Sequence, residues 1–209
     1  MRLLLTGFEP FGGETVNPSW EVARAIEASP PGGIELTTLR LPVTGRISFD
    51  RLLPTLEAGD FDAWLGLGEA GRRPHLSVER VGINVLVDGP GAPEQTLVEG
   101  GPAAYFSQLP VLELATAIAA AGAPARVSNT AGTYICNEVT YVVQHHLATS
   151  DRSMPSGFIH LPYLPEQALN KRPDTPSMAL ETQVLGVRTA LEFVRDLVSV
   201  GVPAAAGSP

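Results

Sequence analysis

The chain contains a single cysteine, Cys136, so it cannot close an internal disulfide or form a metal site from several cysteines. Such a thiol is either a small buried hydrophobe or a nucleophile. A thiol nucleophile needs one group that takes and returns a proton and another that orients that group. His160, in the run GFIHLP, and Glu79, in the run SVER, are the candidates for these two roles. This combination favours the nucleophile.

The expected secondary structure places these groups where thiol chemistry is possible. Short apolar runs alternate with helical periodicity, which is typical of stacked β-α units. Cys136 falls near the start of an expected helix over residues 134–147, where the helix dipole favours a thiolate and free amides can donate to an oxyanion. His160 falls near the carboxyl end of an expected strand over 158–161, and ligands gather at such strand ends. Glu79 is expected to accept a hydrogen bond from the imidazole.

The whole pattern predicts one α/β domain over residues 1–209, a three-layer α/β/α sandwich with a mainly parallel, mixed central sheet. Strands are expected at residues 3–6, 34–41, 63–67, 76–84, 125–128 and 158–161. Helices are expected at 19–28, with Asn17 as N-cap and Pro18 at the first position, and at 47–56, 110–121 and 134–147. A last helix is expected to start at Thr175-Pro176 and to reach about residue 200. Residues 88–102 are expected to form a surface loop, and 204–209 a frayed tail.

Composition excludes several function classes. The formal charge of −8 argues against nucleic acid or an anionic membrane surface as a partner. No segment approaches the run of about 18 apolar residues that a membrane span requires. One thiol without a signal peptide indicates a cytoplasmic protein. No phosphate-binding glycine motif is present, which argues against a nucleotide-using enzyme, and the adjacent His145 and His146 lack metal-ligand spacing.

Each candidate side chain also has a structural interpretation. A cysteine in a helix is commonly inert core, a lone histidine near a strand end is commonly structural, and a Glu-Arg pair is commonly solvated. Phe8 and Phe11 stand three residues apart among turn-forming residues. They either pack as ordinary core or form the walls of a flat pocket for a ring. Residue types alone leave both interpretations open.

Several motifs taken together resemble those of the pyroglutamyl peptidase I family, the pyrrolidone-carboxylate peptidases, which are cysteine omega-peptidases. The resemblance extends from Leu4 to about Val194. It rests on motifs in the family's order: LTGFEPFGG at 5–13 with NPSW at 17–20, ER at 79–80 with Asn84, GGPAAY at 100–105, TAGTYICN at 130–137 and FIHLPYLPEQ at 158–167.

This resemblance implies a cytoplasmic homotetramer that removes N-terminal pyroglutamyl residues from peptides without a metal or cofactor. Cys136 matches the family's nucleophile, His160 its general acid/base and Glu79 the third member of its triad. The pocket for the pyrrolidone ring is matched by Phe8, Phe11, Asn17, Tyr134 and Ile135. Glu69 stands at a pocket position where the family usually has Gln or a small neutral residue.

The chain departs from the family pattern near this site. Many bacterial members carry an arginine, proposed to assist the oxyanion, in the stretch that matches residues 85–91, and this chain has none there. The loop over residues 88–99 is also several residues shorter. We hypothesise that Arg73, or a backbone amide near Cys136, takes the place of that arginine. The alternatives to a pyroglutamyl peptidase are a related thiol amidohydrolase for another small acyl group and a non-catalytic binding scaffold.

Overall fold

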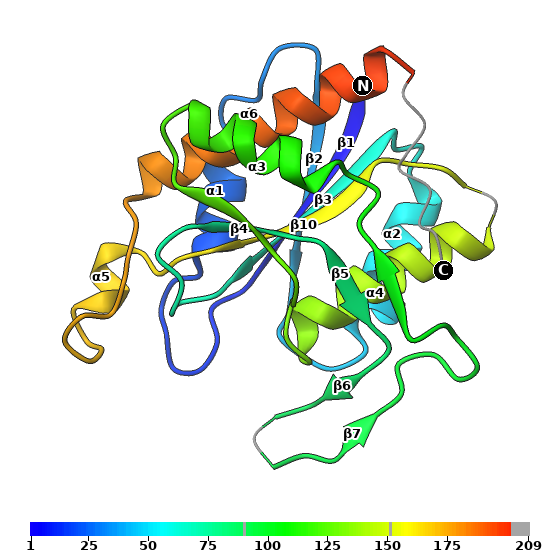
Figure 1. Cartoon of the computed structure of the whole chain (residues 1–209), viewed down its shortest axis with the longest axis horizontal. Coiled ribbons are helices and arrows are strands. Elements are labelled where there is room, and N and C mark those ends of the chain that lie inside the picture. The colour runs from blue at the N-terminus through cyan, green and yellow to red at the C-terminus, as the bar shows by residue number, and fades with distance from the viewer. Residues whose placement is uncertain (90, 151, 202–209) are drawn as a thin grey trace.

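The computed structural model in Figure 1 describes residues 1–89, 91–150 and 152–201, so the tail expected at 204–209 lies outside the described residues. Its centre is a six-stranded sheet in the order β2-β1-β3-β10-β4-β9. Only β4 and β10 pair antiparallel in this sheet, and the other neighbours are parallel. The expected mainly parallel, mixed sheet is confirmed. The strands are β1 (Arg2–Phe8), β2 (Glu35–Leu41), β3 (Ala63–Glu69), β4 (Leu76–Glu79), β9 (Ala125–Ser128) and β10 (Ser156–Leu161).

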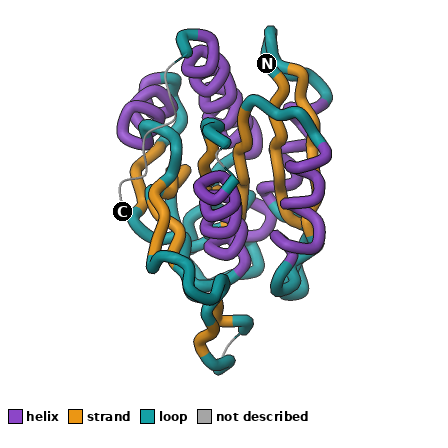
Figure 2. Tube along the Cα trace, turned by 90° about the vertical axis from the view of Figure 1, so that its right-hand side faces the viewer, coloured by secondary structure: helices purple, strands orange, loops and turns teal. Residues whose placement is uncertain are grey.

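Helices cover both faces of this sheet, as Figures 1 and 2 show. Successive side chains of a strand point to opposite faces, so Leu3 and Leu5 of β1 join one core and Leu4 joins the other. The first core is closed by α1 (Pro18–Glu27), α3 (Val111–Ala120) and α6 (Leu180–Ser199). The second is closed by the π-helical turn η1 (Ser48–Leu52), by α2 (Leu53–Ala58) and by α4 (Ile135–Thr149). None of the helices in the described residues combines the length and apolar character needed to cross a membrane.

Some expected elements differ in the structure. The single strand expected at 76–84 is two strands, because the chain leaves the central sheet after Glu79. The second of these, β5 (Val81–Ile83), pairs with β8 (Ala104–Phe106) in a separate two-stranded sheet. The helix expected at 47–56 is the turn η1 followed by α2. The surface loop expected at 88–102 contains the short strand β7 (Glu94–Gln95), which pairs antiparallel with β6 (Leu86–Val87) just before the loop.

The expected helix start at Thr175-Pro176 is wrong, because α6 begins at Leu180. A short helix that was not predicted, α5 (Pro165–Ala168), precedes this segment. Ser177 forms an isolated parallel bridge with Tyr163, and the amide of Met178 donates to the Tyr163 carbonyl at 2.9 Å. These long-range contacts hold the segment extended, so the helix can begin only after it.

The sheet brings the candidate residues to one edge. β1, β3 and β10 run parallel, so their carboxyl ends, with Phe8, Glu69 and His160, lie on the same side of the sheet. β4 runs the other way beside β10, and this places Glu79 opposite Phe158, two residues before His160. The loop from β9 to α4 carries the chain to Cys136 at the same edge.

Candidate active site

Cys136 is the second residue of α4, whose N-cap is Tyr134. Within the described residues this helix has no side-chain cap, so the amides of its first turn have no helical partner. The sulfur packs against the bare backbone of β3 at Gly68, where an added Cβ would lie only 2.8 Å from Sγ. The thiol therefore sits at a helix N-terminus, in a space that exists because residue 68 has no side chain.

Two buried polar residues directly after Cys136 fix the start of α4. The side chain of Asn137 makes three hydrogen bonds, at 2.7 to 2.9 Å, to the backbone of residues 83–85. The carboxylate of Glu138 accepts from the amide of Ser48 at 3.0 Å and from its hydroxyl at 2.6 Å. The sequence analysis missed these residues. Their only signal was polarity at positions that a helix next to the core would bury.

His160 and Glu79 form the rest of a contact chain with the thiol. The imidazole Nδ1 donates to Glu79 Oε1 at 2.7 Å, and both side chains are buried. His160 and Cys136 line the same cavity, and the Cys136 side chain acts on the imidazole from that side. The ring of Phe158 meets the imidazole edge-on, with 5.0 Å between ring centroids. The structure thus brings the three predicted catalytic residues together in the order thiol, imidazole and carboxylate.

The surroundings of His160 favour its protonated form. Burial, the largest single effect, lowers the pKa of this imidazole. Two neighbours, Cys136 and then Glu79, act the other way through their charges and hydrogen bonding. Together they outweigh burial and raise the pKa of His160 from 6.5 to about 9. At neutral pH the imidazole therefore holds its proton beside the sulfur of Cys136, and a protonated imidazole next to the nucleophile is the arrangement that thiol acyl transfer uses.

A small cavity of about 180 Å³ opens beside the sulfur, which is below the ~300–1,000 Å³ typical of sites for drug-sized ligands. All six predicted substrate-binding residues line it, together with the thiol and the imidazole. Glu79 is not part of the lining and contacts His160 instead. The sequence analysis missed Val43 and residues 131–133. The lining consists of Phe8, Phe11, Asn17, Val43, Glu69, Ala131, Gly132, Thr133, Tyr134, Ile135, Cys136 and His160.

The two phenylalanines of the cavity differ in their surroundings. Phe8 is buried and belongs to the core between the sheet and α4, as does Ile135. Phe11 is 40% exposed and lies on the loop after β1. Half-exposed Tyr134 contributes a second aromatic side chain to the lining from the entry to α4. The cavity thus has a rigid floor and a more open rim.

Asn17 has a structural role as well as its place in the lining. Its Oδ1 caps α1 by accepting from the amide of Ser19 at 3.0 Å and from the Ser19 hydroxyl at 2.7 Å. Its Nδ2 donates to the carbonyl of Glu9 at 3.0 Å. The expected N-cap is therefore confirmed. The same side chain fixes the loop that carries Phe11.

Glu69 places a carboxyl group at the end of β3 in the cavity wall. Its Oε2 accepts from Gln167 Nε2 at 2.8 Å, and no other hydrogen bond to this carboxyl group is found among the described residues. Burial and the neighbouring Glu14 raise the pKa of Glu69, against the hydrogen bond from Gln167 and the charge of Lys171. The cavity thus has one strong acceptor among mostly apolar walls.

The contacts of Arg73 disagree with the hypothesis that it binds the oxyanion. Its Nη1 donates to Glu79 Oε1 at 2.5 Å and to Ser128 Oγ at 3.3 Å. Its Nη2 donates to the carbonyl of Thr130 at 3.0 Å. The guanidinium is thus directed to the carboxylate of Glu79 rather than to the thiol. Of the two hypothesised donors, the backbone amides at the start of α4 are the better placed.

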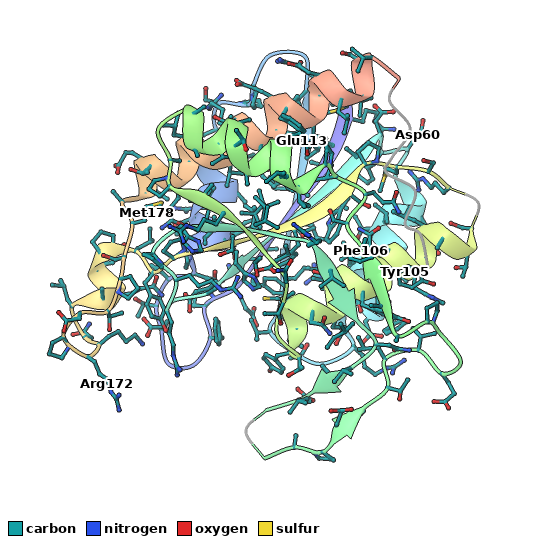
Figure 3. The ribbon with its side chains drawn as sticks, in the orientation of Figure 1. Asp60, Tyr105, Phe106, Glu113, Arg172 and Met178 are labelled. Atoms are coloured by element: carbon teal, nitrogen blue, oxygen red, sulfur yellow. The ribbon has the colours of Figure 1, made fainter. Side chains whose placement is uncertain are left out.

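His145 and His146 lie outside this site. His145 Nδ1 lies 3.0 Å from the hydroxyl of Tyr105, which Figure 3 labels on β8 beside α4. His146 lies 3.6 Å from a carboxylate oxygen of Glu57. Over residues 1–89, 91–150 and 152–201, no three His, Cys, Asp or Glu side chains are grouped to hold a metal ion.

Comparison with known proteins identifies the family. A family model described as pyroglutamyl peptidase matches residues 1–196. A pyrrolidone-carboxylate peptidase of Erwinia tasmaniensis is 44% identical over 198 residues, covering 92% of both chains. One from Streptomyces coelicolor is 45% identical over 198 residues, covering 91% of this chain and 90% of the relative.

Solved structures agree with the sequence relatives. The pyroglutamyl peptidase I of Bacillus amyloliquefaciens has a TM-score of 0.84 and 35% identity, with 93% of this chain and 94% of that chain covered. The pyrrolidone carboxyl peptidase of Fervidobacterium islandicum has a TM-score of 0.86 and 37% identity, with 94% and 99% covered. The chain belongs to the pyroglutamyl peptidase family, whose members remove N-terminal pyroglutamate, as its motifs had indicated.

Proposed function

We propose that this chain removes N-terminal pyroglutamyl residues from peptides, with Cys136 as nucleophile, His160 as general acid/base and Glu79 as its orienting carboxylate. One observation carries the proposal: the contact chain from Cys136 through His160 to Glu79 ends at a cavity sized for a single ring. Membership of the pyroglutamyl peptidase family supports the same substrate. The resemblance further supports a homotetramer in the cytoplasm as the working form.

Acylation begins when the thiolate attacks the carbonyl carbon of the pyroglutamyl residue and a C–S bond forms. The carbonyl oxygen becomes an oxyanion, for which the uncapped amides at the start of α4 are suitable donors. The C–N bond then breaks, and His160 transfers its proton to the leaving amine. The imidazole is now neutral, and the enzyme holds pyroglutamate as a thioester.

Deacylation reverses these roles. Neutral His160 accepts a proton from water as the water oxygen attacks the thioester carbonyl. The C–S bond breaks, free pyroglutamate leaves, and the thiolate-imidazolium pair is restored. Glu79 keeps Nδ1 protonated throughout, so Nε2 remains the nitrogen that exchanges protons with the substrate.

The cavity explains a preference for a neutral lactam. The aromatic walls suit a flat ring, and selectivity then rests on shape and a few hydrogen bonds. Glu69 Oε1 accepts no hydrogen bond from the described residues, so it is available to accept the lactam N–H. An ordinary N-terminal ammonium entering such mostly apolar surroundings would lose its hydration, at a cost of several kcal/mol, and Glu69 is the lining residue that could compensate it.

The proposal is tested by release of the fluorophore from a pyroglutamyl-coumarin amide in the presence of EDTA, since no metal is expected to take part. We expect the wild-type protein to release it and Cys136→Ser to lower kcat/KM more than about 1,000-fold. The control is an unchanged thermal midpoint for the variant. An inactive wild-type protein whose thiol shows no enhanced reactivity with iodoacetamide would favour a non-catalytic scaffold and overturn the proposal.

Glu69 favours a second candidate, a thiol amidohydrolase for a different small acyl group. A carboxylate in the cavity can pair with a ring ammonium, such as that of an N-terminal proline, as well as accept a lactam N–H. Assaying a prolyl-coumarin amide beside the pyroglutamyl compound separates the two. Faster release from the prolyl compound, lost in Glu69→Gln, would establish the second candidate.

A further inference from the structure

Glu79 is a buried carboxylate that has two cationic partners. Its side chain is fully buried, and the same oxygen, Oε1, accepts from both His160 and Arg73. The other oxygen, Oε2, has no hydrogen-bond partner among the described residues. Removing such a carboxylate from water is costly unless cations compensate its charge. His160 and Arg73 are the cations that compensate this buried carboxylate.

The two cations differ in one respect that matters for the reaction. His160 gives up its proton when the leaving amine departs, so its charge is absent during part of each cycle. Arginine does not deprotonate in proteins, so the charge of Arg73 is permanent. While the imidazole is neutral, Arg73 is the cation that remains beside the Glu79 carboxylate.

Arg73 also connects the carboxylate to the loop that enters the nucleophile helix. Its Nη2 donates to the carbonyl of Thr130, and Ser128 Oγ donates to the same carbonyl at 3.1 Å. Residues 131–134 follow at once and line the cavity. One guanidinium thus links β4, the end of β9 and the cavity wall, with only 27% of its side chain exposed.

We propose that Arg73 is a positioning residue, which keeps the carboxylate of Glu79 ionised and directed at His160 throughout the catalytic cycle. It acts through Glu79 and does not touch the substrate, because it is absent from the cavity lining. This inference rests on the proposed function. It goes further by assigning a permanent counter-charge to the triad.

Arg73→Met tests the proposal, since methionine retains much of the side-chain length but has no charge. The other titratable or charged groups around the imidazole are Cys136 and Glu79, together with Glu69 on the neighbouring strand and Tyr134, which line the same cavity. All four remain in the variant. Without the arginine the His160–Glu79 pair holds its proton more tightly, so we expect the alkaline limb of kcat/KM to move to higher pH. We expect kcat to fall about 10- to 100-fold, as for other partners of catalytic groups, with KM changed less than about threefold.

Two further variants make the test specific. Arg72→Met removes the same charge from an exposed neighbour and should leave kcat and the alkaline limb at their wild-type values. Arg73→Lys keeps the charge and loses the planar fork, so it should recover part of kcat without moving the limb. If Arg73→Met fails to fold, Arg73→Lys alone tests the proposal. An alkaline limb that moves in this variant, or a raised KM with an unchanged kcat, overturns the proposal.

A substrate-free measurement separates this inference from the proposed function. The rate of Cys136 alkylation by iodoacetamide should change at the pH where the imidazolium loses its proton, and that step should move up in Arg73→Met. A wild-type protein that is inactive on the coumarin amide would contradict the proposed function. The pH of the step in the alkylation rate could still be compared between the wild type and Arg73→Met. An unmoved step, or a kcat loss with an unmoved limb, means that Arg73 only supports the loop, and this overturns the inference.

Discussion

Phe8 and Phe11 both line the cavity, but only Phe8 also belongs to the core. We therefore expect Phe11→Ala to raise KM for the pyroglutamyl amide with little change in the free energy of unfolding. Phe8→Ala should raise KM too, and should also lower that free energy by about 3–5 kcal/mol. Steady-state kinetics and urea unfolding of both variants measure the difference. Equal losses of stability would mean that Phe11 is packed like core.

The raised pKa of His160 sets the alkaline limit of activity. The imidazolium is the proton donor for the leaving amine, so kcat/KM should fall as pH rises through about 9. Because folding raises the pKa of His160, its proton also contributes to the free energy of unfolding. This contribution is fully present below pH 6.5, the ordinary pKa of the imidazole, and is lost as the pH rises through about 9. A pH profile of kcat/KM checks the first expectation. If the alkaline limb of kcat/KM lay near pH 6.5 instead, Cys136 and Glu79 would not raise the pKa of His160.

At the scale of elements, the contact between α4 and β3 decides where the sulfur lies. A Cβ on Gly68 would fall 2.8 Å from Cys136 Sγ and 2.7 Å from the ring of Phe158, both closer than real side chains approach. We expect Gly68→Ala to displace the thiol and lower kcat at least about tenfold, because misplaced reacting groups lose rate steeply. The coumarin assay measures this.

A matched control for that substitution is Gly32→Ala, where a new Cβ would meet no atom within 4 Å and the backbone has no positive φ. Its activity should equal that of the wild type. Full activity in Gly68→Ala would instead show that β3 and α4 can separate without harm to the site.

For the whole molecule, the homotetramer stays a prediction from the family resemblance. Multi-angle light scattering should give a mass four times the 22.0 kDa of the chain. Each subunit contains Cys136, His160, Glu79 and the cavity residues. We therefore expect that dilution, which dissociates the assembly, lowers the measured mass before it changes kcat/KM. A mass of one chain at every concentration would contradict the prediction.

Local signals predicted much of the fold. Asn17 followed by Pro18 marked the start of α1 correctly, because capping depends on residues next to each other. The expected strands at 3–6 and 63–67 lie within β1 and β3, since continuous apolar runs are typical of buried parallel strands. The errors fell where distant partners decide, as at the start of α6, which the bridge between Tyr163 and Ser177 delays.

The sequence by itself determined the types of the reactive groups and the family. One thiol, one histidine at a strand end and a set of ordered motifs are properties of the chain that need no coordinates. The tertiary structure decided which groups meet. Glu79 reaches His160 across 81 residues because β4 pairs antiparallel with β10. Arg73 reaches the loop before α4 because β4 also pairs with β9, in parallel, and places Glu79 beside Ser128. Strand order is set by packing between distant segments and leaves no periodic trace in the sequence.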